Sequence, residues 1–381
     1  MDFDSVISST SGLLIGTIVP FLFVLTIVVF FHELGHFLVA RWCGVKVKVF
    51  SIGFGPEIFG WFDRKGTRWR VSWIPLGGYV KFAGDEGAAS TPDLDEIGRM
   101  SEEERAGAFH LKPLWARIAV VAAGPLANFL LAIVIFTMMF AFVGRQITTA
   151  HVDRIAPDSA AEEAGIEIGD LIVSIDGQDI NSFSDMQRIV SVSADLTLEI
   201  VVERSGELLT LQATPKRREM TDRFGNVQKI GLLGISRTAN PENFRLERYS
   251  LPQAVIIGVQ ETYFVIKRTL GYLRDVIVGR EDASQLGGPI RIAQVSGQVA
   301  TLGIIPLINL AALLSVSIGL INLFPIPMLD GGHLLYYAIE GILGRPLGEK
   351  AQEFGFRIGL ALLLMLMIFA TWNDVTNLSL M

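Results

Sequence analysis

Residues 13–40 read LLIGTIVPFLFVLTIVVFFHELGHFLVA. Leu13 to Phe31 contains no charged residue, and an apolar stretch of this length can span the hydrocarbon core of a bilayer as a helix. A motif with three ionisable side chains, H-E-L-G-H at residues 32–36, follows immediately. Ionisable groups at membrane depth are costly unless a partner or a metal ion satisfies them. The setting therefore favours a metal site over a surface helix that carries two histidines by chance.

The motif has the pattern H-E-x-x-H. On a helix, residues four apart lie on the same face, so His32 and His36 can bind one metal ion. Glu33 lies beside the first ligand, where its carboxylate can accept a proton from a water on the metal. A zinc hydrolase site combines two such imidazoles with a third protein ligand from elsewhere and an open position for water.

The composition is that of a membrane protein with a water-facing part. Half of the 381 residues are apolar, which is high for a soluble protein. The net charge of −7 gives no indication of nucleic-acid binding. A single cysteine, Cys43, excludes an internal disulfide and a cysteine-rich zinc site. With only five histidines in the chain, the candidates for metal ligands are few.

Four long apolar segments predict membrane spans at residues 13–38, 117–143, 302–324 and 356–372. Acidic residues stand before the first segment, where a signal peptide would carry Lys or Arg, so we expect a retained span. Basic residues follow the first span and lie between the third and fourth. The positive-inside rule then predicts that both termini lie outside and that these loops lie in the cytoplasm. The metal motif falls near the cytoplasmic end of its span.

Residues 46–52 and 68–73 alternate polar and apolar side chains, which predicts two strands. These strands form either a small cytoplasmic sheet or a hairpin beside the active site that offers an edge strand to an extended substrate. The pattern alone leaves both interpretations open. Residues 85–107 are acidic and poor in large apolar residues, which predicts a mobile loop.

Residues 145–215 predict a compact α+β domain, with a short helix at 184–192 and a hairpin of 196–203 and 208–214. The topology above places this domain outside the cytoplasm. Residues 249–278 mix apolar runs with Lys and Arg, which favours an interfacial helix over a span.

A second unusual stretch, NLFPIPMLDGGH at residues 322–333, ends the third span. Its two prolines break the helix, and broken backbone persists at membrane depth only where protein or a cavity surrounds it. Asp330 is the sole carboxylate between Asp282 and Glu340, and a carboxylate at this depth needs a partner. We therefore predict Asp330 as the third metal ligand. His333 is the alternative ligand, and otherwise it hydrogen-bonds backbone or Asp330.

Two asparagines lie in the predicted spans. Asn322 has donors and an acceptor, so it can bind substrate backbone or an oxyanion, or it can join two helices. Asn128, at the start of the second span, is predicted to make a hydrogen bond between helices rather than to act in catalysis.

Together these residues resemble the site-2 protease family of intramembrane metalloproteases. The matching stretches are FHELGHF (31–37), FSIGFGP (50–56), PLGGYVK (75–81), AGPLANF (123–129), GGPI (287–290) and residues 322–333. The resemblance covers nearly the whole chain, and its paired HExxH and Leu-Asp-Gly motifs are highly specific. It implies an α-helical membrane protein with four transmembrane helices, a membrane-re-entrant β-hairpin and one inserted α+β PDZ domain.

The resemblance also implies the roles of individual residues. Zn²⁺ is expected on His32, His36 and Asp330, with Glu33 as the catalytic acid/base. The re-entrant hairpin is expected to include residues 77–82, and an edge strand there would hold an unwound substrate segment by main-chain bonds. The substrate-binding residues predicted on this strand are Gly77, Gly78, Tyr79 and Val80, in addition to Asn322, which is predicted from its donors and acceptor.

The expected organisation has seven parts. They are a first span with the HExxH motif (1–43), a β region and mobile loop (44–116), a second span (117–144), the PDZ domain (145–215), a linker and interfacial helix (216–300), a third span with the Asn322 and Asp330 motif (301–333), and a cytoplasmic loop with the fourth span (334–381). The best-known bacterial members of the family carry two PDZ domains in tandem, whereas this chain predicts one.

The resemblance implies a zinc metalloprotease of the bacterial inner membrane that cleaves transmembrane segments of single-span proteins. The implied substrates are anti-sigma factors already trimmed outside the membrane, within a stress response, or signal-peptide remnants. The PDZ domain would filter substrates by size or bind a newly exposed C-terminal peptide. A PDZ-bearing membrane tether predicts a lost ligand or base, and a metal transporter or sensor predicts several ligand clusters; the sequence contains neither feature.

Overall fold

The computed structural model describes residues 3–85, 98–221, 227–237, 245–280, 283 and 286–378. The chain forms two compact units, one of residues 1–137 with 255–381 and one of residues 138–254. The first, helical unit carries all the residues of the predicted metal site. The second is inserted between the two halves of the first.

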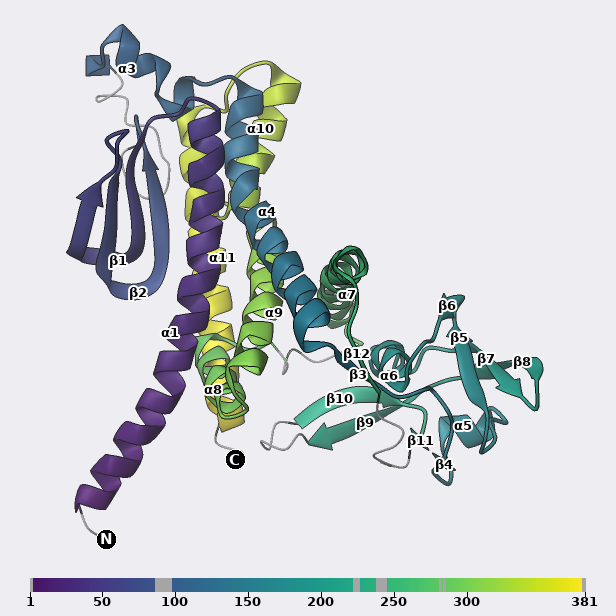
Figure 1. Cartoon of the computed structure of the whole chain (residues 1–381). Helices are drawn as coiled ribbons and strands as arrows, with labels where there is room; N and C mark the ends of the chain where they lie inside the picture. The colour runs from purple at the N-terminus through teal and green to yellow at the C-terminus, as the bar shows by residue number, and fades with distance from the viewer. Residues whose placement is uncertain are drawn as a thin grey trace. The chain divides into compact units, whose positions relative to one another are not determined.

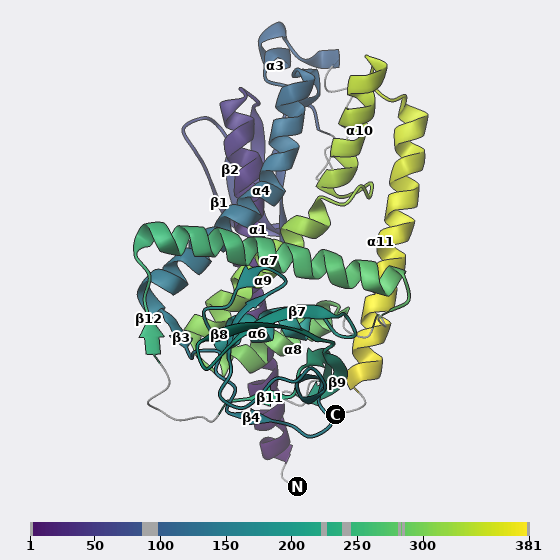
Figure 2. The ribbon, with the colours of Figure 1, turned by 90° about the vertical axis from the view of Figure 1, so that its right-hand side faces the viewer.

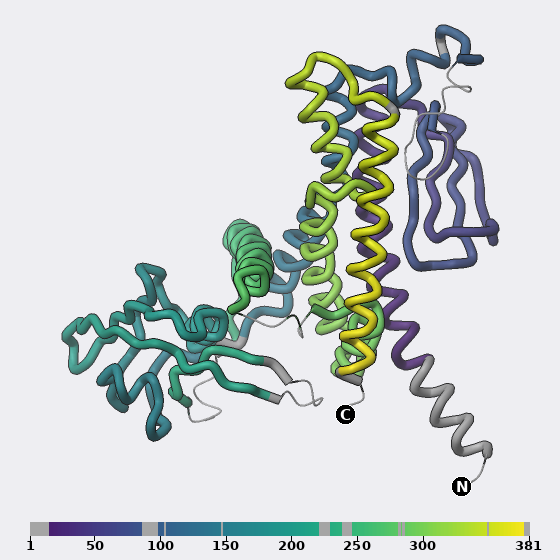
Figure 3. The backbone as a smooth tube through the Cα atoms, turned by 180° about the vertical axis from the view of Figure 1, so that it is seen from behind, coloured from purple at the N-terminus to yellow at the C-terminus, as the bar shows by residue number. Residues whose placement is uncertain are grey.

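The helical unit contains four helices that are long and apolar enough to cross a membrane within the described residues. In Figures 1 and 3 they stand roughly upright together. Their bounds are α1 (Phe3–Trp42), α4 (Leu114–Met138), α9 (Ile304–Asn322) and α11 (Glu349–Leu378). The candidate spans within them are Ile15–Trp42, Leu114–Val143, Ile304–Asn322 and Lys350–Thr376. The four spans predicted from the sequence are confirmed as helices of this kind.

Among the described residues, the helical unit also contains five helical elements that are not candidate spans. They are α3 (Glu102–Ala106), the 3₁₀ turn η1 (Phe109–Leu111), α7 (Leu251–Ile277), α8 (Pro289–Ala300) and α10 (Asp330–Leu343). Figure 2 shows α7 lying across the upright helices. It carries the basic residues that predicted an interfacial helix, and it is not one of the candidate spans.

The predicted mobile loop at 85–107 falls largely on residues 86–97, which lie outside the described residues. Its last part forms α3, which the sequence pattern did not predict. Ser101 and Glu104 make a capping box there, because the Ser101 side chain accepts the Glu104 N–H and the Glu104 side chain accepts the Ser101 N–H.

A curled two-stranded sheet lies beside the C-terminal half of α1 (Figures 1 and 3). Its strands are β1 (Val47–Phe62) and β2 (Arg68–Phe82), both longer than predicted. Because the strands bend, Phe50 pairs with both Trp69 and Val80. Within the described residues, the strand partners of residues 78–82 are residues 47–52 alone, so 78–82 forms an edge of the sheet. Phe50 is fully buried and its ring contacts that of Phe37 on α1, with centroids 5.4 Å apart.

The inserted unit is an α+β fold. A four-stranded antiparallel sheet has the order β6-β5-β7-β8, and its core includes the fully buried Ile172, Ile175 and Ile200. The elements are β3 (Arg145–Ile147), β4 (Arg154–Ile155), α5 (Ala160–Glu163), β5 (Leu171–Ile175), β6 (Gln178–Asp179), α6 (Phe183–Ser191), β7 (Leu198–Arg204), β8 (Glu207–Ala213), β9 (Lys216–Thr221), β10 (Val227–Leu232), β11 (Ile235–Ser236) and β12 (Arg245–Glu247), preceded by the π-helical turn η2 (Met139–Val143).

The predicted short helix and hairpin of this unit correspond to α6 and to β7 with β8. The unit continues beyond residue 215, where the sequence predicted a linker. Strand β11 pairs with β4, and Leu233 is buried in the same core as the four-stranded sheet.

Candidate metal centre

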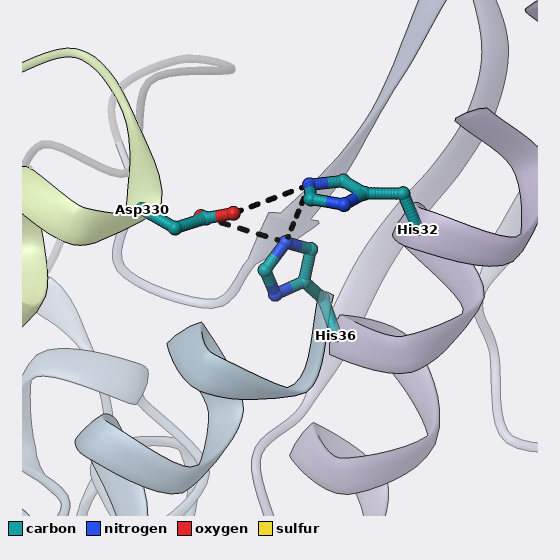
Figure 4. A group of neighbouring side chains, drawn as sticks. All are labelled: His32, His36 and Asp330. Carbon is teal, nitrogen blue, oxygen red and sulfur yellow. Dashed lines mark hydrogen bonds and ion pairs between the residues drawn. The ribbon is translucent and has the colours of Figure 1, made fainter. Parts of the chain in front are cut away.

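Three predicted ligands, from opposite ends of the chain, meet in the helical unit (Figure 4). His32 Nε2 lies 3.2 Å from Asp330 Oδ2, and His36 Nε2 lies 3.6 Å from Asp330 Oδ1. The two histidine Nε2 atoms are 3.3 Å apart. One ligand atom from each residue therefore lies within 4.8 Å of the others, which is the arrangement of three donors around one ion.

The donors fit a zinc ion in type and in electrostatics. Their side chains are 11%, 12% and 17% exposed, for His32, His36 and Asp330. Asp330 Oδ2 is buried and makes no hydrogen bond, although a ring nitrogen lies close to it. Buried carboxylate oxygens are rarely left without a donor or a cation. A set of two imidazole nitrogens and one carboxylate is a set that catalytic zinc takes, with a fourth position left open.

Helix α4 contacts the His36 ring on its Nδ1 side. The Val120 carbonyl lies 2.9 Å from His36 Nδ1 and accepts its proton, which leaves Nε2 with a lone pair for a metal. Close approach of the helices depends on Gly124, because a Cβ there would lie 2.2 Å from His36 Nε2. On the facing helix, a Cβ at Gly35 would lie 2.3 Å from the Ala123 carbonyl oxygen. Small residues at this crossing thus allow α4 to contact the metal ligands.

Asp330 is placed by a break in the helix. Two prolines separate α9 from α10, and Met328 has a φ of +91°, a region that residues other than glycine rarely adopt. Gly331 packs under this turn, where a Cβ would lie 2.2 Å from the Phe324 carbonyl oxygen. Further along α10, the Glu340 carboxylate accepts two hydrogen bonds from the Arg117 guanidinium, at 2.5 and 3.1 Å. The helix that begins at Asp330 is therefore tied to the start of α4.

Glu33 lies between the metal ligands and the curled sheet. A Cβ at Gly78 would lie 3.1 Å from Glu33 Cγ, so the sheet edge packs directly against the motif. The Val80 backbone N–H donates a hydrogen bond to the Glu33 carboxylate. The edge formed by residues 78–82 therefore lies beside Glu33. The hairpin thus packs against α1 beside the HExxH motif.

The chain matches the peptidase family M50 over residues 20–366. This chain belongs to peptidase family M50. Its relatives include a protein of Agrobacterium fabrum described as a candidate zinc metalloprotease, which is 53% identical over 98% of this chain and 99% of that protein. Metalloprotease MmpA of Caulobacter vibrioides is 41% identical over 94% of this chain and 95% of that protein. The chain is therefore a zinc metalloprotease, and the non-enzymatic alternatives are not supported.

Solved structures that resemble part of this M50 peptidase include a PDZ domain. The PDZ domain of an SdrC-like protein from Listeria monocytogenes is 20% identical and covers 23% of this chain and 86% of that domain, with a TM-score of 0.18. This similarity is too low to assign the inserted unit.

The other residues that the sequence predicted for the site lie outside the group of three ligands. Within the described residues, the ligand cluster contains Asp330 and not His333, whose ring packs against Phe356 with centroids 5.7 Å apart. Asn322 ends α9 half-buried, and no described hydrogen bond joins its side chain to the metal ligands. Tyr79 stacks on Phe54 with centroids 6.1 Å apart, and its hydroxyl accepts a hydrogen bond from Arg70. A Cβ at Gly77 would lie 2.4 Å from the Phe54 ring.

Sequence reasoning missed one buried pair near the end of β2. Asp85 is fully buried, and its Oδ1 lies 3.0 Å from His110 Nε2. Its other oxygen accepts the Phe82 N–H at 3.0 Å. The pair anchors the chain where β2 ends. It was missed because Asp85 opens a stretch whose composition predicted a loop.

Proposed function

We propose that this M50 peptidase hydrolyses peptide bonds within transmembrane segments of single-span membrane proteins. The observation that carries the proposal is the depth of the site. His32 and His36 lie within the candidate span Ile15–Trp42, and Asp330 follows the break after the span Ile304–Asn322. Ligands in these positions serve a substrate that is itself in the membrane.

In this proposal His32, His36 and Asp330 hold the zinc ion. Zinc bound there supplies a Lewis acid and a water nucleophile at neutral pH. Glu33 acts as general base and then as general acid, accepting the proton of the attacking water and returning it to the leaving amine. The Val80 N–H orients the carboxylate for these transfers, since it fixes one Glu33 oxygen.

Substrate binding is proposed at residues 77–82. A helical substrate hides its carbonyls in its own hydrogen bonds, so its segment must unwind before cleavage. The edge of the sheet that faces Glu33 offers main-chain partners to an unwound strand. Main-chain hydrogen bonds do not distinguish the side chains of the substrate, so we expect low sequence selectivity. Asn322 is proposed to assist by binding substrate backbone or the oxyanion, since its side chain has both donors and an acceptor.

We propose that the curled sheet is re-entrant. Large apolar side chains on β1 and β2 are exposed, which is unfavourable in water and favourable in lipid. The most exposed are Trp73 (68%), Phe62 (65%), Phe59 (63%) and Ile58 (57%). Their surroundings would be the lipid bilayer.

The inserted unit is proposed to be a PDZ domain outside the cytoplasm. Its support is the sequence resemblance together with its sheet order, its helix α6 and the pairing of β11 with β4. It would filter substrates by size or bind a C-terminal peptide. From the same resemblance we propose the bacterial inner membrane as the location, with both termini periplasmic. Anti-sigma factors trimmed outside the membrane, or signal-peptide remnants, are the proposed substrates.

The test is cleavage of a single-span reporter by the purified protein in proteoliposomes, with zinc counted in each variant. We expect the wild type to cut within the spanning segment. Glu33→Gln should keep zinc and lose cleavage, and Asp330→Ala should lose both. His333→Asn is the matched control and should retain zinc and cleavage, because it lies outside the cluster. Cleavage by Glu33→Gln, or cuts confined to water-exposed segments, would contradict the proposal.

A further inference from the structure

Asn128 is a fully buried polar residue of α4 that lies against one of the metal ligands. Its Nδ2 is 3.3 Å from His32 Nδ1. Its Oδ1 is buried with no hydrogen-bond partner. Its main-chain oxygen accepts a hydrogen bond of 2.8 Å from Ser315 Oγ on α9. The side chain thus occupies a closed space between His32 and α9, where an unsatisfied amide oxygen is costly.

The chemistry of the neutral imidazole determines what His32 needs from this neighbour. A ring that binds a metal through Nε2 carries its proton on Nδ1, so Nδ1 needs an acceptor. His36 has that acceptor in the Val120 carbonyl, 2.9 Å from its Nδ1. His32 faces the Asn128 amide instead, and the amide nitrogen supplies a second donor there.

Half a turn about the Cβ–Cγ bond of Asn128 exchanges its oxygen and nitrogen with little change of shape. In that orientation Oδ1 accepts the His32 Nδ1 proton, so the ring proton and the orphaned oxygen are satisfied by one hydrogen bond. His32 Nε2 then carries a lone pair toward Asp330 and the metal position.

We propose that Asn128 is a positioning residue that holds His32 in the ring form able to bind zinc. The inference rests on the proposed zinc site and adds to it an acceptor for His32 Nδ1. With Val120, it gives α4 one acceptor for each histidine ligand. The amide acts through His32 and does not touch the substrate.

The expected effect is on metal affinity. Outer partners of metal ligands typically contribute about 10–100-fold in affinity. Asn128→Leu keeps the size and removes the acceptor, so zinc binding should weaken by roughly that factor. Asn128→Asp keeps an acceptor oxygen and should restore most of the affinity. Ser315→Ala is the matched control, since it removes the other hydrogen bond to the same residue without touching the imidazole.

Two readouts are needed on the full-length protein in detergent. The zinc dissociation constant is measured by competition with a chelator. The tautomer of His32 in the metal-free protein is read from ¹⁵N shifts of labelled histidine, which is practicable because the chain has five histidines. We expect the Nδ1–H form in the wild type, Asn128→Asp and Ser315→Ala, and a shift toward the Nε2–H form in Asn128→Leu.

The outcomes separate this inference from the proposed function. Unchanged affinity and tautomer in Asn128→Leu, with only a lower melting temperature, would overturn the positioning role and leave a packing role. Asn128→Ala is the second variant should Asn128→Leu fail to fold, and it carries the same expectations. Absence of zinc binding in the wild type would instead refute the zinc site, while the tautomer comparison would still test Asn128.

Discussion

Replacing Gly124 by alanine tests whether close helix packing sets the metal geometry. The added Cβ would lie 2.2 Å from His36 Nε2 and 2.9 Å from His32 Cε1. Non-bonded heavy atoms need about 3.5 Å, so the rings or α4 must move by roughly 1 Å or more. A displacement of this size at a catalytic group costs about 100-fold in rate, and overpacking of this kind destabilises a fold by about 1–3 kcal/mol.

The assay compares kcat/KM, bound zinc and melting temperature for Gly124→Ala and for Gly16→Ala. The control adds the same methyl group on α1, where no atom lies within 4 Å of the new Cβ. We expect Gly124→Ala to lose zinc and at least about 100-fold in kcat/KM, whereas Gly16→Ala should match the wild type. Wild-type zinc content and turnover in Gly124→Ala would refute the packing argument.

Three further predictions concern other parts of the helical unit. Asp374 accepts hydrogen bonds from the Gly288 and Arg291 N–H groups at 2.8 and 3.0 Å and so caps α8. Asp374→Ala should lower the free energy of unfolding by about 1–3 kcal/mol, measured by thermal melting. The variant should retain zinc. Burial raises the pKa of Asp63, but hydrogen bonds from the Trp69 indole, two backbone amides and Arg41 outweigh it and lower that pKa to about 2. Its stabilisation of about 2 kcal/mol is therefore complete above its ordinary pKa of 3.8 and is lost as pH falls toward 2; acid titration of unfolding should show a smaller loss in Asp63→Asn. Removing zinc with a chelator should abolish cleavage and increase amide hydrogen exchange around Met328. The reason is that a bound ion would offset the charge of Asp330 beside the strained turn. Unchanged exchange around Met328 would contradict this link between the ion and the turn.

The parts of the site that sequence predicted are those whose chemistry is costly without a partner. His32, Glu33 and His36 stand out because three ionisable groups follow an uncharged span. Asp330 stands out because no other carboxylate lies near it in the chain and two prolines open the helix before it. The four spans could also be predicted from sequence, because the length of an apolar segment is enough to identify a helix that can cross a bilayer.

The parts that sequence did not predict depend on tertiary contacts that local patterns do not record. The strands around residues 46–52 and 68–73 alternate as expected, but the bend that lets Phe50 pair on both sides arises from the fold of the whole hairpin. Leu233 belongs to the core of the inserted unit, although it lies in the stretch predicted to be a linker. A main-chain acceptor such as the Val120 carbonyl leaves no trace in sequence, because every residue has one.

The stretch AGPLAN illustrates how one pattern can carry two functions. Small residues in a span predict close helix packing, and a polar residue there predicts a hydrogen bond between helices. Both expectations hold for α4, since Gly124 lies against the histidine rings and Asn128 bonds across the interface. The partner of that bond on the other helix is His32, which we propose as a zinc ligand. The contacts that pack α4 against α1 are therefore the same contacts that orient the proposed ligands. A substitution that disturbs the packing must also be tested for its effect on metal binding.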